Sequence, residues 1–184
     1  MDELERLRTE LARTDQELLQ LFLRRMQIVA DVAEHKIKTQ SAVFVPEQET
    51  KVIRDVQAKT PPELEPYATV LAGTLMRLSR ERQYELLLAM DPSKAEDYAS
   101  RYSSLGAGKM RLLVHNQRET PRETPLALVM NIFSDLGLPV THVQSLDSGR
   151  IHLEFLVTSQ AQAWRAFFQI EQEVGEIYLL GYNP

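Results

Sequence analysis

Leucines and other apolar residues recur in steps of three, four and seven along the first forty residues. The segment 3–39 contains neither proline nor glycine, and this spacing predicts one long helix with a coiled-coil-like apolar stripe. At 1.5 Å per residue this helix is about 55 Å long, more than a small domain covers alone, so a partner chain is expected. The stripe consists of Leu4, Leu7, Leu11, Leu18, Leu21, Ile28 and Val32.

Prolines divide the rest of the first ninety residues into two further helices. A break at 41–46 precedes a short helix at about 46–58, which Thr60-Pro61-Pro62 ends because proline removes backbone hydrogen bonds. A third helix is predicted at about 63–90, where Asp91-Pro92 stops it. Residues 1–92 are therefore expected to form an all-helical first domain.

The second half of the chain has a different pattern. After a linker or short helix at 93–108, the sequence predicts an α+β domain at 109–184. The expected elements are a strand at 110–114, a helix from the Thr124-Pro125 cap to about Gly137, a strand at 140–145, a turn at 147–149, a strand at 151–157, a helix at about 159–174 and a strand at 176–180. This βαββαβ order is the ferredoxin-like arrangement, so the fold class is α followed by α+β.

The composition excludes several function classes. The net charge is −5, and neither half of the chain is basic, so no nucleic-acid partner is expected. The chain has no cysteine and its four histidines are scattered, so no metal site is predicted. No apolar run reaches the roughly 20 residues that cross a bilayer. We therefore expect a soluble, cytoplasmic protein that binds no membrane.

Two cations on the long helix share one face. Arg25 belongs to the seven-residue series of the apolar stripe, where a charge is costly unless it is paired. Lys36 lies 11 residues later, only about 20° around the helix and roughly 16 Å along it. The two are spaced to hold opposite ends of a small anion. Arg8 is about 25 Å from Arg25 along the axis, so it can join this site only from an antiparallel partner chain.

Polar residues on the other two helices complete a candidate pocket. Ser79 and Gln83 are four residues apart and share a face of the third helix, while Glu49 on the short helix is placed to close the pocket. The plainer alternative is a helical dimer whose solvated surface carries ordinary charges.

The first 90 residues resemble the all-helical chorismate mutases. The matching motifs are Leu4-Glu5-Arg6-Leu7-Arg8, Asp15-Gln16-Glu17-Leu18-Leu19-Gln20-Leu21, Arg25-Met26, Lys36, Glu49, and Ser79 with Gln83. The chain departs from the family at two positions. Gln48 stands where the family usually has an arginine, and Val45 stands where an acidic residue is common. We still expect Gln48 to contact the substrate.

The resemblance implies an intertwined dimer of three-helix chains that rearranges chorismate to prephenate without a cofactor. The enzyme selects the compact substrate conformer and stabilises charge at the breaking ether bond. Implied roles are carboxylate binding by Arg25 and the partner chain's Arg8, donation to the ether oxygen by Lys36 and Gln83, acceptance from the ring hydroxyl by Glu49, and support of a carboxylate by Ser79.

Residues 109–184 resemble the ACT regulatory domain of prephenate dehydratase and of the bifunctional mutase–dehydratases. The likeness rests on the element order, on Leu112-Leu113 and on the ending Leu180-Gly181-Tyr182-Asn183-Pro184. The family's two phenylalanine-binding motifs correspond here to Thr124-Pro125-Leu126-Ala127 and Gln144-Ser145-Leu146-Asp147. The resemblance implies feedback by phenylalanine or tyrosine, with effector contacts at Thr124, Leu126 and Ser145.

Two alternatives stay open at this point. The first is a regulatory or binding protein that keeps both folds without catalysis, which the Gln48 and Val45 departures favour. The second is an isochorismate-pyruvate lyase on the same helical fold, which also requires Lys36 and the arginines.

Overall fold

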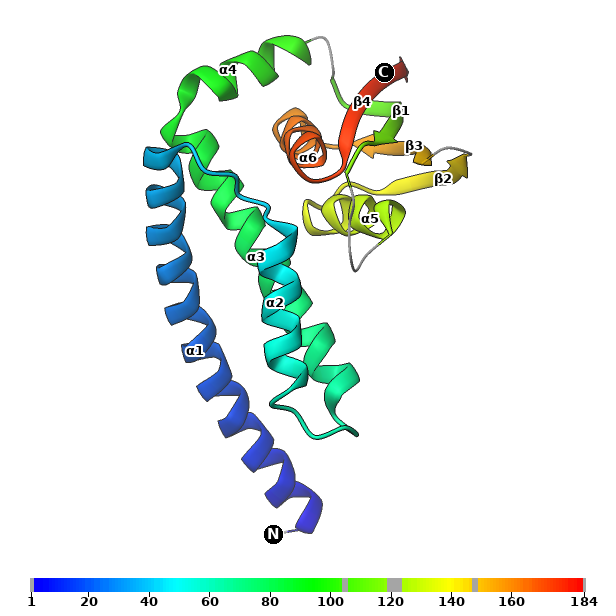
Figure 1. The fold of residues 1–184 in the computed structure, drawn as a ribbon. Coiled ribbons are helices and arrows are strands. Elements are labelled where there is room, and N and C mark those ends of the chain that lie inside the picture. The colour runs from blue at the N-terminus through cyan, green and yellow to red at the C-terminus, as the bar shows by residue number, and fades with distance from the viewer. Residues whose placement is uncertain (1, 104–105, 119–123, 147–148, 184) are drawn as a thin grey trace.

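The first part of the chain consists of three helices in the predicted long, short, long order. The computed structural model describes residues 2–103, 106–118, 124–146 and 149–183 (Figure 1). Helix α1 (Glu3–Thr39) lies beside α3 (Glu65–Met90), and the short helix α2 (Pro46–Gln57) also packs on α3. Proline occupies the first turn of both α2 and α3, where its missing N–H breaks no helical bond.

The segment between the two parts contains a short helix, one of the two structures that the sequence predicted for 93–108. Helix α4 (Pro92–Arg101) begins after Asp91, whose side chain accepts from the Lys94 backbone N–H. Its residue Tyr98 is buried, with its ring 5.1 Å from that of Phe168. The chain therefore reaches its second part through a packed helix.

The second part is a four-stranded antiparallel sheet with two helices, in the predicted βαββαβ order. Its elements are β1 (Gly108–Asn116), α5 (Pro125–Asp135), β2 (Val140–Leu146), β3 (Arg150–Val157), α6 (Gln160–Glu173) and β4 (Gly175–Asn183). The strands lie in the order β2-β3-β1-β4. Within the predicted turn at 147–149, Asp147 and Ser148 lie outside the described residues, and Gly149 adopts a positive φ of 73°.

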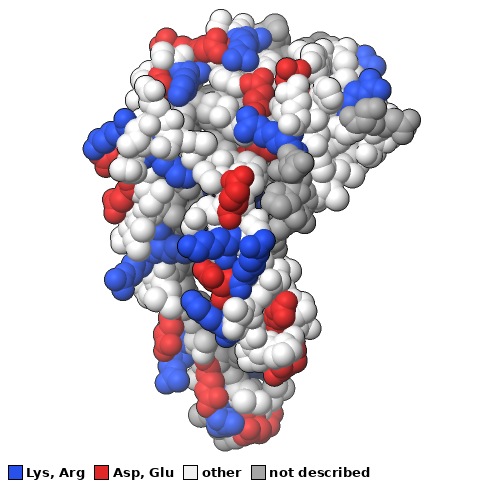
Figure 2. All heavy atoms as spheres, viewed as in Figure 1, with Lys and Arg blue, Asp and Glu red and all other residues white. Residues whose placement is uncertain are grey.

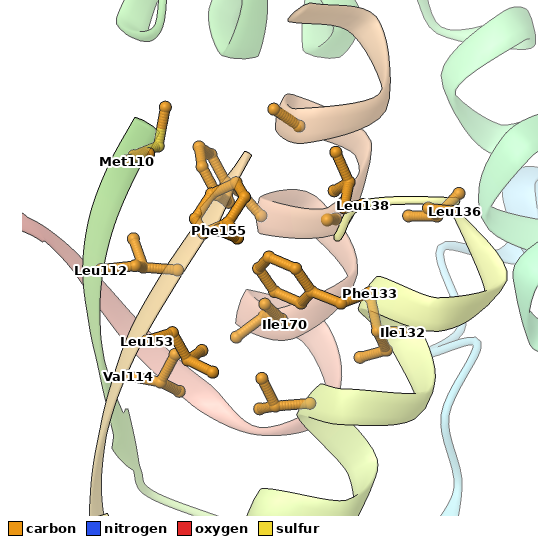
Figure 3. Packing of buried hydrophobic residues seen from close by; sticks show 14 of the residues in the cluster. Met110, Leu112, Val114, Ile132, Phe133, Leu136, Leu138, Leu153, Phe155 and Ile170 are labelled. Carbon is orange, nitrogen blue, oxygen red and sulfur yellow. The ribbon is translucent and has the colours of Figure 1, made fainter. Parts of the chain in front are cut away.

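The core of this second part lies between the sheet and its two helices. Alternate residues of β1 and β3 are buried, as expected for a sheet covered on one face. Figure 3 shows Leu112 and Leu153 from these strands facing Phe133 of α5 and Ile170 of α6. The rings of Phe133 and Phe155 pack edge to face, with their centroids 4.6 Å apart.

Ion pairs and aromatic rings join the two parts. On α3, Arg77 pairs with Asp135 of α5, and the buried Arg80 pairs with Glu173 at the end of α6. The rings of Tyr84 and Phe168 lie edge to face, with centroids 5.7 Å apart. One face of α3 therefore serves as the base for the second part.

Helix α1 leaves its apolar stripe uncovered. Each of the seven predicted stripe residues is exposed, from 41% at Val32 to 63% at Leu11, and the N-terminal end of α1 projects beyond the other helices (Figure 1). Basic and acidic side chains stand beside one another over the helices (Figure 2), some as pairs within one turn such as Arg6 with Glu10. In the described part of the chain, no helix has the length and apolar content needed to span a bilayer.

Candidate active site

A cavity of about 480 Å³ lies between α1, α2 and α3. Its wall combines three cations, one carboxylate and several apolar side chains. The lining residues are Arg25, Ile28, Val29, Val32, Lys36, Val43, Val45, Gln48, Glu49, Val52, Met76, Ser79, Arg80 and Gln83. The structure thus brings together five of the six residues predicted as catalytic, and also Gln48.

Arg25 enters the cavity from α1 and is held by α3. Its guanidinium donates to the Leu75 carbonyl at 3.0 Å and to Ser79 Oγ. Ser79 is itself buried and donates to the same carbonyl at 2.6 Å. Partial burial lowers the pKa of Arg25, but the group stays charged at physiological pH because arginine's usual pKa is so high. Ser79 therefore orients Arg25.

Lys36 lies near the end of α1, at the same cavity. Its Nζ donates to the Val43 carbonyl at 2.8 Å, which leaves two of the three ammonium protons for other acceptors. Partial burial lowers the pKa of Lys36 below its usual value, and the negative charge of Glu49 partly opposes this shift. A bound anion would favour the charged ammonium further.

Gln83 lies on the α3 wall with one polar atom unsatisfied. Its side chain is buried, and Nε2 donates to the Ser79 carbonyl at 3.1 Å. Gln83 Oε1 is buried and has no hydrogen-bond partner among the described residues. A buried amide oxygen without a partner is costly, and a rotated amide group would present Nε2 instead.

Arg80 is a cation of this site that the sequence interpretation missed. It is only 5% exposed, and it pairs with Glu49 of α2 and with Glu173 of α6. Burial lowers its pKa, but the charges of Glu173 and Glu49 outweigh this and raise the pKa above its usual value. The sequence did contain an indication that Arg80 is buried, because it belongs to a series of α3 residues spaced by four. The series, which is buried in the structure, is Ala72, Met76, Arg80, Tyr84 and Leu88.

The two positions that depart from the resembled family both lie in the cavity wall. Val45 precedes α2, and its carbonyl accepts from the N–H groups of Gln48 and Glu49. Valine offers no side-chain acceptor to cap a helix. The side chain of Gln48 is exposed at the rim. Both substitutions leave uncharged side chains in the wall, so its charge comes from Arg25, Lys36, Arg80 and Glu49.

Arg8 does not line the cavity of its own chain. It is exposed on α1, 17 residues and about 25 Å along the helix from Arg25. The three predicted effector contacts lie in the second part of the chain. Thr124 caps α5 and accepts from the Ala127 N–H at 3.2 Å, Leu126 packs partly against the core, and Ser145 is exposed on the edge strand β2.

The arrangement suits a small ligand with two negative charges and an apolar body. Arg25, Lys36 and Arg80 provide charge-assisted donors, and the valines and Met76 provide the apolar contacts. Within the described ranges, no three carboxylate or imidazole side chains come together as metal ligands do.

Comparison with known proteins gave one match. The model of the family described as chorismate mutase type II matches residues 7–84. The matched segment begins just before Arg8 and ends just after Gln83, so it spans all six predicted catalytic positions. No curated protein and no solved structure gave a match. The match covers the helices that form the cavity and stops before the sheet.

Proposed function

We propose that this protein is a chorismate mutase, an isomerase that converts chorismate to prephenate in aromatic amino-acid biosynthesis. One observation carries the proposal: within the segment that matches the type II family, a single cavity gathers Arg25, Lys36, Glu49, Ser79 and Gln83. The reaction is a unimolecular rearrangement of a dianion. It needs a site that selects one conformer and stabilises developing charge, and this chain supplies donors and apolar walls for both tasks.

Each side chain has a distinct role in the proposed reaction. Arg25, oriented by Ser79, binds one substrate carboxylate through its planar fork. Lys36 and the amide nitrogen of Gln83 donate to the ether oxygen as the C–O bond breaks and charge gathers there. Glu49 accepts a hydrogen bond from the ring hydroxyl. The reacting carbons then meet between the apolar side chains of the wall.

The proposed active site is shared by two chains. The exposed stripe of α1 includes Leu11 at 63% and Leu21 at 62%, which an antiparallel copy of α1 would cover. Such pairing brings Arg8 of the partner subunit toward the cavity, because Arg8 and Arg25 lie on either side of the middle of α1. The added cation closes the clamp on the second carboxylate.

For the second part we propose a regulatory ACT-like domain of the ferredoxin-like class. The element order βαββαβ and the strand order β2-β3-β1-β4 support this assignment. The proposed ligand is phenylalanine or tyrosine, bound near the start of α5 and the end of β2, where Thr124, Leu126 and Ser145 lie.

Replacement of Lys36 tests the mutase directly. Lys36→Ala is expected to lower kcat about 10²- to 10³-fold, because it removes a preorganised donor to the ether oxygen. The assay follows loss of chorismate absorbance and identifies prephenate by chromatography. Lys38→Ala is the matched control, because Lys38 is exposed on the same turn and pairs only with Glu34 among described residues. Near-normal turnover in Lys36→Ala would refute the assignment, and pyruvate release would indicate a lyase instead.

The activity is expected to fall at alkaline pH. Lys36 must be protonated to act, and burial lowers its pKa, so kcat/KM declines as pH rises through a value below the usual lysine range. The bound dianion raises this pKa, so kcat declines at higher pH than kcat/KM. Both profiles are measured at constant ionic strength. Lys36→Arg should shift the alkaline limb upward, and an unchanged limb would remove Lys36 from this role.

Mixed dimers test the shared site. Arg8→Ala and Lys36→Ala chains are each expected to be nearly inactive alone. After random exchange of subunits in equal amounts, about one quarter of the sites contain neither change, so about one quarter of wild-type activity should return. If both residues act within one chain, mixing restores nothing.

The regulatory proposal has its own reporter. Trp164 of α6 is the chain's single tryptophan, so its fluorescence follows changes in the second part. Phenylalanine or tyrosine is expected to change this fluorescence and to slow chorismate conversion over the same concentration range. Ser145→Ala, at an exposed position of β2, should raise the amino-acid concentration that both effects require. If neither amino acid changes the fluorescence or the rate, the second part does not regulate the enzyme in this way.

A further inference from the structure

Arg80 connects the cavity to the second part of the chain. Its Nη1 donates to Glu49 inside the cavity, and its Nε donates to Glu173 Oε1 of α6 at 3.0 Å. The guanidinium also stacks on Phe44, with 5.1 Å between its central carbon and the ring centroid. Arg80 also lines the cavity, and no described residue accepts a hydrogen bond from its Nη2. The Arg80 guanidinium is thus held by one carboxylate on each of two sides, and its third nitrogen is available to a ligand.

Glu173 lies wholly inside the protein, with none of its surface exposed. Its Oε1 also accepts from Gln169 at 3.1 Å, while Oε2 and the neighbouring Tyr84 Oη are buried without hydrogen-bond partners among the described residues. Burial raises the pKa of Glu173, against the opposing charge of Arg80. Buried ion pairs of this kind add little net stability, so stability alone does not account for the placement of this carboxylate.

The two carboxylates that pair with Arg80 have different positions relative to the cavity. Glu49 lines the cavity and Glu173 does not, so only Glu49 is available to a ligand. If Glu49 turns to a ligand hydroxyl, Arg80 still keeps one buried acceptor, and its direction into the cavity is retained. The freed Nη1 then joins Nη2 as a two-pronged donor, the arrangement that arginine uses to bind a carboxylate.

We propose that Arg80 binds a carboxylate of the substrate and that Glu173, on the second part of the chain, is the positioning residue that aims it. This assignment rests on the proposed mutase function and adds to it a contact from outside the segment 7–84. It implies that the cavity of the helical part is complete only when α6 is docked on α3.

The test measures binding of prephenate, the dicarboxylate product, to the whole protein by calorimetry, so it does not depend on turnover. Arg80→Met is expected to raise the prephenate Kd on the order of 10- to 100-fold, the value of a lost hydrogen-bonded ion pair. Arg77→Met is the matched control. Arg77 also pairs with the second part, through Asp135, but it does not line the cavity, and its Kd should stay within about 3-fold of wild type.

Glu173 is tested by a conservative and a truncating change. Glu173→Gln keeps the acceptor for Arg80 Nε and should stay within about 3-fold of the wild-type Kd, whereas Glu173→Ala should weaken binding about 10-fold or more. Asp135→Ala is the control for general loosening of the junction. Urea unfolding of each variant separates the two roles, because a purely structural residue lowers the midpoint without changing the Kd of the folded protein.

The outcomes separate the two proposals. Wild-type protein that converts chorismate and binds prephenate, with Arg80→Met binding equally well, would overturn the role of Arg80 and leave the mutase intact. Wild-type protein that neither converts chorismate nor binds prephenate would overturn the mutase and this inference with it. If Arg80→Met fails to fold, Arg80→Lys retains the charge without the fork, and its Kd should still rise about 10-fold.

Discussion

A guanidinium cannot stay buried without partners, and the rest of this molecule is arranged around that requirement. Arg80 lies on the buried face of α3, with Glu49 on one side and Glu173 on the other. The first carboxylate belongs to the cavity and the second to the sheet-bearing part. One charged group therefore contacts α2, the cavity and α6 at once. On the same helix α3, the ring of Tyr84 packs edge to face on Phe168 of α6.

The helical part cannot cover its own longest helix. Its internal core is small, with Ile53, Ala72 and Met76 as its buried cluster, whereas the apolar stripe of α1 faces solvent along its whole length. The second part is the opposite, since its sheet and two helices enclose a large core of their own (Figure 3). The two halves thus reach stability in different ways, one through packing within the chain and the other, as proposed, through a second copy.

The cavity is characterised by the fixed positions of its charged donors. Arg25 is fixed by Ser79, and Lys36 is fixed by the Val43 carbonyl, so the donors are held before any ligand arrives. Donors held in advance stabilise developing charge better than mobile ones, because they need not reorganise during the reaction. Gln48 and Val45 contribute no charge to the wall, and Arg80 adds a cation to it from α3.

The sequence by itself determined the element order and most of the cavity. Helical spacing is local, so Arg25 and Lys36 on one face, and Ser79 with Gln83 on another, followed from residue numbers alone, and proline marked where the helices end. Only the tertiary structure decided the partners of Arg80. Glu173 lies 93 residues away, and no periodicity relates positions on two elements that meet only when α6 docks on α3. Long-range pairing of charges depends on that docking. The face of a helix on which a residue lies depends only on its position in the helical repeat.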